Sequence, residues 1–147
     1  MKFHDSKYFS NDGISLASVE HLGRVFSATS QLLEEDFDKV SKFTGCRFAE
    51  MKAEIRALKY ERNLEKQKCE EIRKFVKACC QCKNWDKNSP TAKVVYRQLN
   101  KRIKRVNQLA DQINMLQQEL LIAIRRQDLV TAALQRKKEK DAESKNN

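Results

Sequence analysis

The chain has 147 residues, of which 34% are charged and 40% hydrophobic, and it contains only three Gly and one Pro. Sandwiches, barrels and doubly wound sheets need a turn about every dozen residues, so this shortage of turn-forming residues argues against them and favours long helices. The net charge of +10 predicts a soluble chain that attracts polyanions.

Residues 1–14 show no sustained hydrophobic period, and we expect them to form a flexible N-terminal tail. This segment lacks the apolar core of a signal peptide, and no stretch of the chain reaches the ~20 apolar residues that span a bilayer. The five Cys, an odd number crowded into one half of the chain, predict reduced thiols rather than a disulfide framework. We therefore expect an intracellular protein of the cytoplasm or nucleus that does not span a membrane.

Apolar residues then recur at three- and four-residue steps, starting with Val19, and they predict a long helix over residues 15–83. Ser15 can cap the N-terminus of this helix. Because Gly in a helix interior costs about 1 kcal/mol relative to Ala, we expect the helix to bend or break near Gly45. Beyond that point the spacing becomes regular, and the apolar positions assigned to a partner-binding seam are Met51, Ile55, Leu58, Ile72 and Val76.

Two charged residues, Arg62 and Glu65, occupy seam positions of this helix. A neighbouring helix cannot bury an unpaired charge without a large cost in free energy. We therefore expect the helix either to be exposed in this stretch or to pair these residues with charges on a partner.

A polar loop is predicted over residues 84–89, followed by a coiled-coil helix over residues 90–138. Pro90 fits the first helical turn, where its missing backbone N–H costs nothing. Eleven of the thirteen seam positions of this helix are apolar at unbroken three- and four-residue spacing, and the charged residues 139–147 are expected to form a disordered tail. The seam positions assigned to partner binding are Val95, Leu99, Val106, Leu109, Ile113, Leu116, Leu120, Val130 and Leu134.

The predicted fold class is all-α, with two long helices in an elongated arrangement, either a bent helical hairpin or tandem coiled-coil helices. Ile103, Ala110 and Ile124 widen the apolar stripe of the second helix beyond a two-helix seam. Because two helices cannot cover so wide a stripe, the predicted partners are other coiled-coil subunits. A homodimeric coiled coil is the structural alternative, although a parallel pair would place Arg102 against its own copy.

Positive charge is concentrated in residues 51–105, which carry 17 Lys and Arg against six Asp and Glu. This region would either pair with acidic side chains of another subunit or contact an acidic surface, namely a membrane leaflet, a microtubule or nucleic acid. Nucleic acid is disfavoured, because aromatic residues that stack on bases are not interleaved with the basic ones. The densest part of the basic patch consists of Lys93, Arg97, Lys101, Arg102, Lys104 and Arg105.

Cys79, Cys80 and Cys82 lie close together near the predicted loop. Structural zinc needs four converging ligands, and no His or Cys follows to complete the set, so we expect no metal site. The run resembles sites of reversible palmitoylation in composition, with Trp85 and lysines beside it. The remaining interpretation is that these are small packing residues and incidental thiols near a helix end.

Catalytic signals are lacking in the sequence, which has no Gly-rich phosphate loop and only two His, neither of them near a Cys or Ser in a plausible arrangement. The acidic run from Glu34 to Asp38 does not have the spacing of a metal-binding loop. We therefore expect a non-enzyme with no cofactor and no small-molecule substrate.

The predicted function is that of a scaffold or tethering subunit of a hetero-oligomeric intracellular complex, because the wide apolar stripe is itself a binding surface. In architecture alone the chain resembles the small helical subunits of complexes of lysosome-related organelle biogenesis, of kinetochores and of the spindle, which implies a role of the vesicle-trafficking or kinetochore type. The alternative function is a basic helical module that binds an acidic surface.

Overall fold

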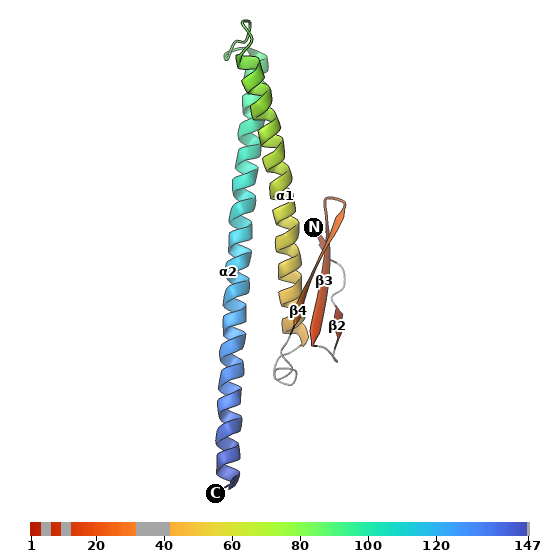
Figure 1. Cartoon of the computed structure of the whole chain (residues 1–147), viewed down its shortest axis with the longest axis vertical. Coiled ribbons are helices and arrows are strands. Elements are labelled where there is room, and N and C mark those ends of the chain that lie inside the picture. Colours follow the sequence, from red (N-terminus) through yellow and green to blue (C-terminus); the bar gives the residue numbers. More distant parts are fainter. Residues whose placement is uncertain (4–6, 10–12, 32–41, 147) are drawn as a thin grey trace. The chain divides into compact units, whose positions relative to one another are not determined.

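The computed structural model describes residues 1–3, 7–9, 13–31 and 42–146. In chain order the elements are β1 (Lys2–Phe3), β2 (Lys7–Phe9), β3 (Ile14–His21), β4 (Arg24–Gln31), α1 (Lys42–Cys80) and α2 (Pro90–Asn146) (Figure 1). The prediction of two long helices joined by a short polar loop is confirmed, and most of the chain is helical. The chain forms two compact units, residues 1–57 with 115–147 and residues 58–114, which we call unit 1 and unit 2.

The prediction of a helix from residue 15 is wrong, because residues 14–31 form two strands and α1 begins only at Lys42. Every second side chain of β3 is buried from Ser15 to Val19, which is the period of a strand with one covered face. β4 contains Val, Phe and Thr, which favour strands, and two Ser, which are poor helix formers. The apolar steps of three and four residues in this segment therefore did not indicate a helix. Residues 32–41 of the predicted helix lie outside the described residues.

The structure also differs from the predicted bounds of the N-terminal tail, the loop and the C-terminal tail. The expected flexible tail at residues 1–14 contains β1 and β2, which pair with β3. The start of the second helix at Pro90 is confirmed, but the loop begins after Cys80, and α2 continues through the expected disordered tail to Asn146. That tail is rich in Lys, Glu, Arg and Ala, which are strong helix formers and extend a helix that already exists.

The sheet is antiparallel and centred on β3. β4 pairs with the full length of β3, from Ile14 opposite Gln31 to His21 opposite Arg24, so β1 and β2 share the other edge of β3. Leu22 and Gly23 connect β3 to β4, and both have positive φ angles, of 52° and 74°. Two positive φ angles are typical of the tight type I′ hairpin turn, which gives two strands a fixed register.

The sheet packs on α1 through a stripe of small residues, and Figure 1 shows the strands beside the first turns of this helix. Gly45, Ala49, Ala53 and Ala57 are buried and recur every four residues, so they lie on one face of α1. Ala53 and Ala57 form a core cluster with Val19 and Ala28 of the hairpin, and Phe26 packs against it. The small side chains allow the backbones of sheet and helix to approach closely.

The same turns of α1 also cover backbone groups of β4. Lys52 donates a hydrogen bond from Nζ to the carbonyl oxygen of Thr29 at 3.3 Å, and Arg56 donates one to the carbonyl oxygen of Ser27. A strand at the edge of a sheet would otherwise offer such groups to a strand of another molecule. These two side chains therefore protect the hairpin from pairing with other strands.

A double-mutant cycle tests the close approach of α1 and β3. A Cβ atom at Gly45 would lie 2.5 Å from the buried Ser15 Oγ, but 3.5 Å from the Ser15 Cβ. We expect Gly45→Ala to stabilise the chain by up to about 1 kcal/mol in a Ser15→Ala background, through helix propensity, and to give no gain or a loss with Ser15 present. Urea unfolding measures both effects. Equal effects in the two backgrounds would show that the two residues do not touch.

Candidate functional site

Unit 2 contains the end of α1, the connecting loop and the start of α2. The loop ends in local caps, since the backbone N–H of Ala92 donates to Ser89 Oγ at 3.2 Å and that of Asn88 to Asp86 Oδ1 at 2.9 Å. Ser89 is therefore the N-cap of α2. Pro90 follows it in the first turn, so the chain reverses direction within a short segment.

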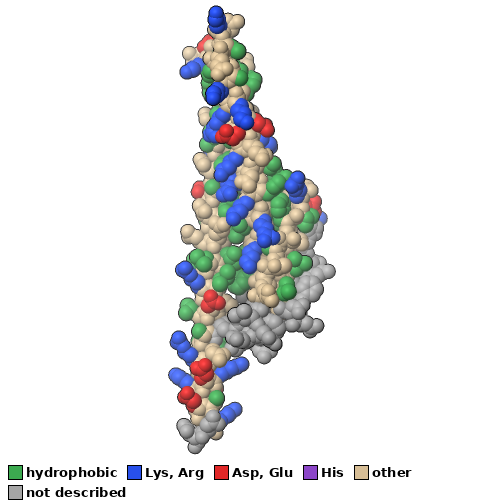
Figure 2. Space-filling view, in the orientation of Figure 1, with side chains coloured by type: hydrophobic (Ala, Val, Ile, Leu, Met, Phe, Trp, Pro, Cys, Tyr) green, Lys and Arg blue, Asp and Glu red, His purple; other side chains and the backbone are tan. Residues whose placement is uncertain are grey.

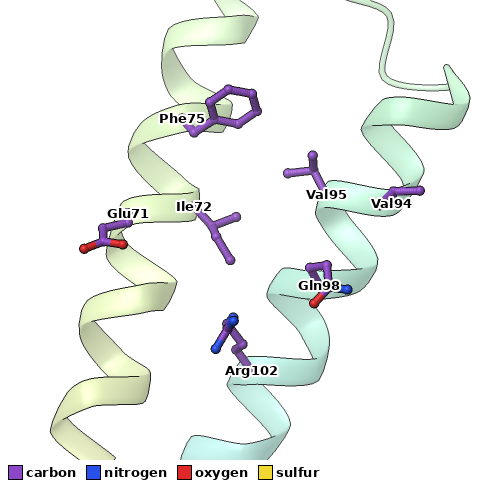
Figure 3. Close-up of a pocket in the computed structure, with 7 residues that line it drawn as sticks. All are labelled: Glu71, Ile72, Phe75, Val94, Val95, Gln98 and Arg102. Carbon is purple, nitrogen blue, oxygen red and sulfur yellow. The ribbon is translucent and has the colours of Figure 1, made fainter.

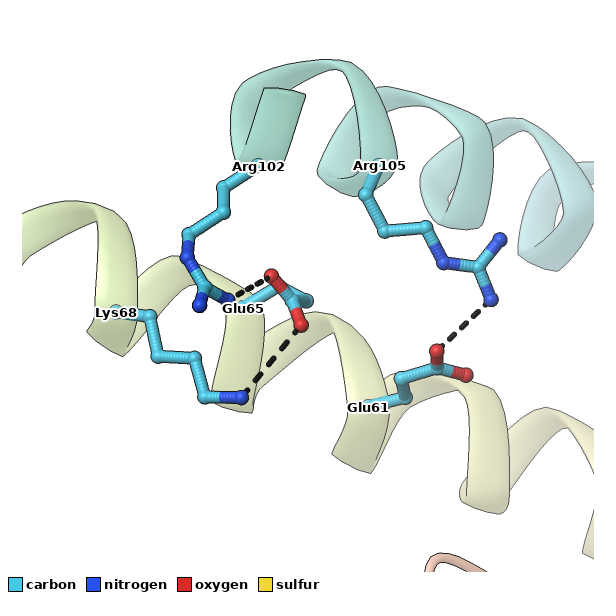
Figure 4. A network of polar contacts seen from close by, with 5 residues as sticks. All are labelled: Glu61, Glu65, Lys68, Arg102 and Arg105. Carbon is cyan, nitrogen blue, oxygen red and sulfur yellow. Dashed lines mark hydrogen bonds and ion pairs between the residues drawn. The ribbon is translucent and has the colours of Figure 1, made fainter. Parts of the chain in front are cut away.

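Two ion pairs join the helices of unit 2 (Figure 4). Glu65 Oε2 lies 3.1 Å from an Arg102 guanidinium nitrogen, and Glu61 Oε1 lies 2.8 Å from one of Arg105. The two Glu side chains are only 17% and 13% exposed, so solvent screens these pairs less than it screens surface pairs. Lys68 adds a longer contact to Glu65 at 3.8 Å.

The ion pairs correct the prediction made for charged seam positions. The helix was expected to be exposed at Arg62 and Glu65 or to pair them with charges on a partner, but Glu65 pairs with Arg102 within the chain. Both pairs run from a residue of α1 to a residue of α2 in one antiparallel register. The charged positions therefore fix which turns of the two helices face each other.

The basic patch divides accordingly into two groups. Arg102 and Arg105 form the ion pairs, whereas Lys93, Arg97, Lys101 and Lys104 are exposed. On the face shown in Figure 2, Lys and Arg side chains cover more of the surface than Asp and Glu side chains do. The sequence thus located the patch, and the structure separates its paired members from its exposed ones.

A groove between the two helices of unit 2 lies close to the loop (Figure 3). It has a volume of about 450 Å³, and Ile72, Phe75 and Val95 point into it. Phe75 and Val94 are each 53% exposed, which is unusual for large apolar side chains in a groove. The complete lining is Glu71, Ile72, Phe75, Val94, Val95, Gln98 and Arg102.

A second hollow of about 470 Å³ adjoins the first and is lined by charged and amide-bearing residues. The two share Gln98 and Arg102, so an apolar groove continues directly into a basic one. The lining of this basic hollow is Glu65, Gln98, Lys101, Arg102, Lys104, Arg105 and Gln108.

The predicted seam residues differ in exposure, and five of them belong to the chain's own core. Met51, Ile55, Leu58, Leu109 and Ile113 are each at most 7% exposed in the lone chain, and their assignment to partner binding stays a prediction. Val130 and Leu134 are exposed, as a partner-binding role requires. The remaining predicted seam residues are half-buried: Ile72, Val76, Val95, Leu99, Val106, Leu116 and Leu120.

Sequence reasoning missed several exposed apolar residues. Phe75 and Val94 of the groove lie next to seam positions but outside the seam. Met115, Ile122 and Leu129 of α2 are 64%, 48% and 71% exposed, and they recur every seven residues on the side of the helix away from the seam. That spacing is visible in the sequence, but the stronger seam pattern obscured it.

The five cysteines are all described, and none forms a disulfide. Cys80 and Cys82 are exposed and Cys69 is buried, while the Cys82 thiol lies 3.7 Å from the carbonyl oxygen of Ala78. In the described part of the chain, no three His, Cys, Asp or Glu side chains gather where a metal ion could bind. Within the same residues, neither helix has a stretch that is long and apolar enough to cross a membrane.

No protein-family model, no curated protein and no solved structure matches this chain.

A charge swap tests the ion-pair register. Glu65→Arg places a cation beside Arg102 and Lys68, and we expect it to destabilise the chain by about 1–2 kcal/mol. Adding Arg102→Glu should recover about 1 kcal/mol or more in urea unfolding, although that change alone is also destabilising. Arg73→Glu is the control, because its pair with Glu70 is more than half exposed and should contribute about 0.5 kcal/mol at most. Additive effects of the two swapped residues would contradict the register.

Proposed function

We propose that the chain is a non-enzymatic scaffold or tethering subunit of a hetero-oligomeric complex, and that α2 beyond Asn114 binds helices of other subunits in a coiled-coil arrangement. The supporting observation is the exposure of large apolar side chains along this stretch of α2. The set, with the exposed fraction of each residue, is Met115 64%, Leu121 48%, Ile122 48%, Leu129 71%, Val130 51% and Leu134 39%.

These side chains offer favourable free energy to a partner. Fully burying a large apolar side chain is worth about 1.5–3 kcal/mol, so covering the exposed half of one contributes about 1 kcal/mol. Six such residues supply several kcal/mol against the entropy cost of association. Because they lie on both the seam side and the opposite side of α2, the surface suits more than one helical neighbour.

The place of this assembly is part of the proposal. Five unpaired cysteines, two of them exposed, suit a reducing compartment, where thiols stay reduced. We therefore place the complex in the cytoplasm or nucleus.

The second candidate function, binding of an acidic surface, is supported by the exposed Lys93, Arg97, Lys101 and Lys104. It is the weaker of the two, since Arg102 and Arg105 are already neutralised by Glu65 and Glu61. Charge that is paired within the chain adds little to the attraction of a polyanion.

A matched pair of substitutions in α2 tests the proposed function. Val130→Asp puts a charge on the seam, and Ala132→Asp puts the same charge on an exposed residue two positions away. We expect Val130→Asp to release the tagged chain from its native complex in size-exclusion chromatography of a cell lysate, while Ala132→Asp leaves it in the high-mass fraction. Circular dichroism of the purified variants checks that both fold.

A native chain that elutes as a monomer from the same lysate would contradict the proposal. So would a shift of equal size in both variants, since it would mean that the seam has no special role.

A further inference from the structure

We infer that the apolar groove and the basic hollow of unit 2 together form a docking site for an acidic amphipathic helix of another protein. The site lies in unit 2 and uses none of the exposed residues of α2 beyond Asn114. It therefore stands independently of the proposed function.

The groove supplies the apolar half of the site. Ile72 and Phe75 from α1 and Val95 from α2 point into the same space, and Phe75 remains half exposed there (Figure 3). A volume of about 450 Å³ is large enough for two or three apolar side chains at helical spacing. An amphipathic helix in this groove would cover the exposed half of Phe75.

The basic hollow supplies the charge that selects the partner. Residues 58–114 carry 15 Lys and Arg against six Asp and Glu, and the ion pairs of Glu61, Glu65 and Glu70 each neutralise one Arg of the same segment, so a net charge of +9 remains. Lys101 and Lys104 line the hollow and are exposed. The potential at this site is therefore strongly positive, and it favours a partner with carboxylates beside its apolar face.

The arrangement of the two hollows favours a helix over other anionic partners. They adjoin through Gln98 and Arg102, so apolar and basic contacts follow one another along the hairpin. A flat lipid leaflet would not fill a groove between two helices. Nucleic acid would bring no apolar side chains into the groove, and the residues that line the basic hollow include no aromatic on which a base could stack.

The test uses the purified full-length chain and a labelled 18-residue peptide with Leu at i, i+3, i+4 and i+7 positions and Glu on the rest of its surface. The matched peptide carries Lys in place of Glu. We expect fluorescence anisotropy to show saturable binding of the acidic peptide that weakens as salt is raised, and no saturable binding of the basic one.

Two variants and their controls locate the binding. Phe75→Ser, and separately Lys101→Gln with Lys104→Gln, should each raise the Kd at least about tenfold, which corresponds to roughly 1.4 kcal/mol. Val25→Ser and Lys137→Gln with Lys140→Gln remove an apolar side chain and two basic ones at exposed positions outside the site, and they should change the Kd less than about twofold. All the substituted residues are at least partly exposed, so the variants retain the fold.

Several results would overturn the inference. One is the lack of saturable binding of the acidic peptide, and another is an equal loss in the control variants. A third is that phosphatidylserine vesicles bind the native chain and the Phe75→Ser variant alike and displace the peptide, because the patch would then recognise anionic lipid and not a helix. None of these results contradicts partner binding by the exposed apolar residues of α2 beyond Asn114, so failure here leaves the proposed function standing.

Discussion

The ion pairs of Glu61 with Arg105 and of Glu65 with Arg102 are the interactions on which the arrangement of unit 2 depends. An apolar seam alone allows two helices to slide by a heptad, since one Leu or Val replaces another at little cost. A charge in the seam removes that freedom, because in any other register it would be buried without a partner. The register set by these pairs brings Ile72 and Phe75 of α1 to Val95 of α2 and so creates the groove.

In unit 1, the packing of small side chains joins the β3–β4 hairpin to α1. Its helix face is made of Gly and Ala, and the hairpin that packs on it is made largely of Ser, Ala and Val, so both surfaces are nearly smooth. Such a contact gains less from the burial of large side chains and more from the close approach of backbones. Lys52 and Arg56 complete it by covering carbonyl groups of β4. Small residues therefore lie where the sheet packs on α1, whereas several large apolar residues of α2 are exposed.

The sequence predicts the features of the fold that depend on local interactions, such as the start of a helix and its length. The start of α2 follows from Ser89 and Pro90, and the length of both helices follows from the lack of Gly and Pro beyond Gly45, Pro90 excepted. The β-hairpin could not be recognised, because Val19, Val25 and Phe26 fit a helical step as well as an alternating one. The burial of every second residue of β3 against α1 decides between a helix and a strand. This burial depends on tertiary packing, which the local sequence does not show.

The sequence identified several residues of the candidate site but not the contacts between them. Glu65 and Arg102 stood out as charged seam positions, yet nothing in one chain states that they pair with each other. Phe75 and Val94 lie outside the seam, so they gain importance only when the hairpin register places them at one groove. Likewise, the sequence did not indicate that Leu109 and Ile113 are buried in the lone chain.

Amide hydrogen exchange on the chain, alone and within its native assembly, tests whether partner helices cover α2 beyond Asn114. We expect amides of residues 99–114 to be protected in both samples, because Leu109 and Ile113 are buried in the lone chain. Amides of residues 116–134 should exchange quickly in the isolated chain and become strongly protected in the assembly. Equal protection of residues 116–134 in both samples would show that no partner covers this stretch of α2.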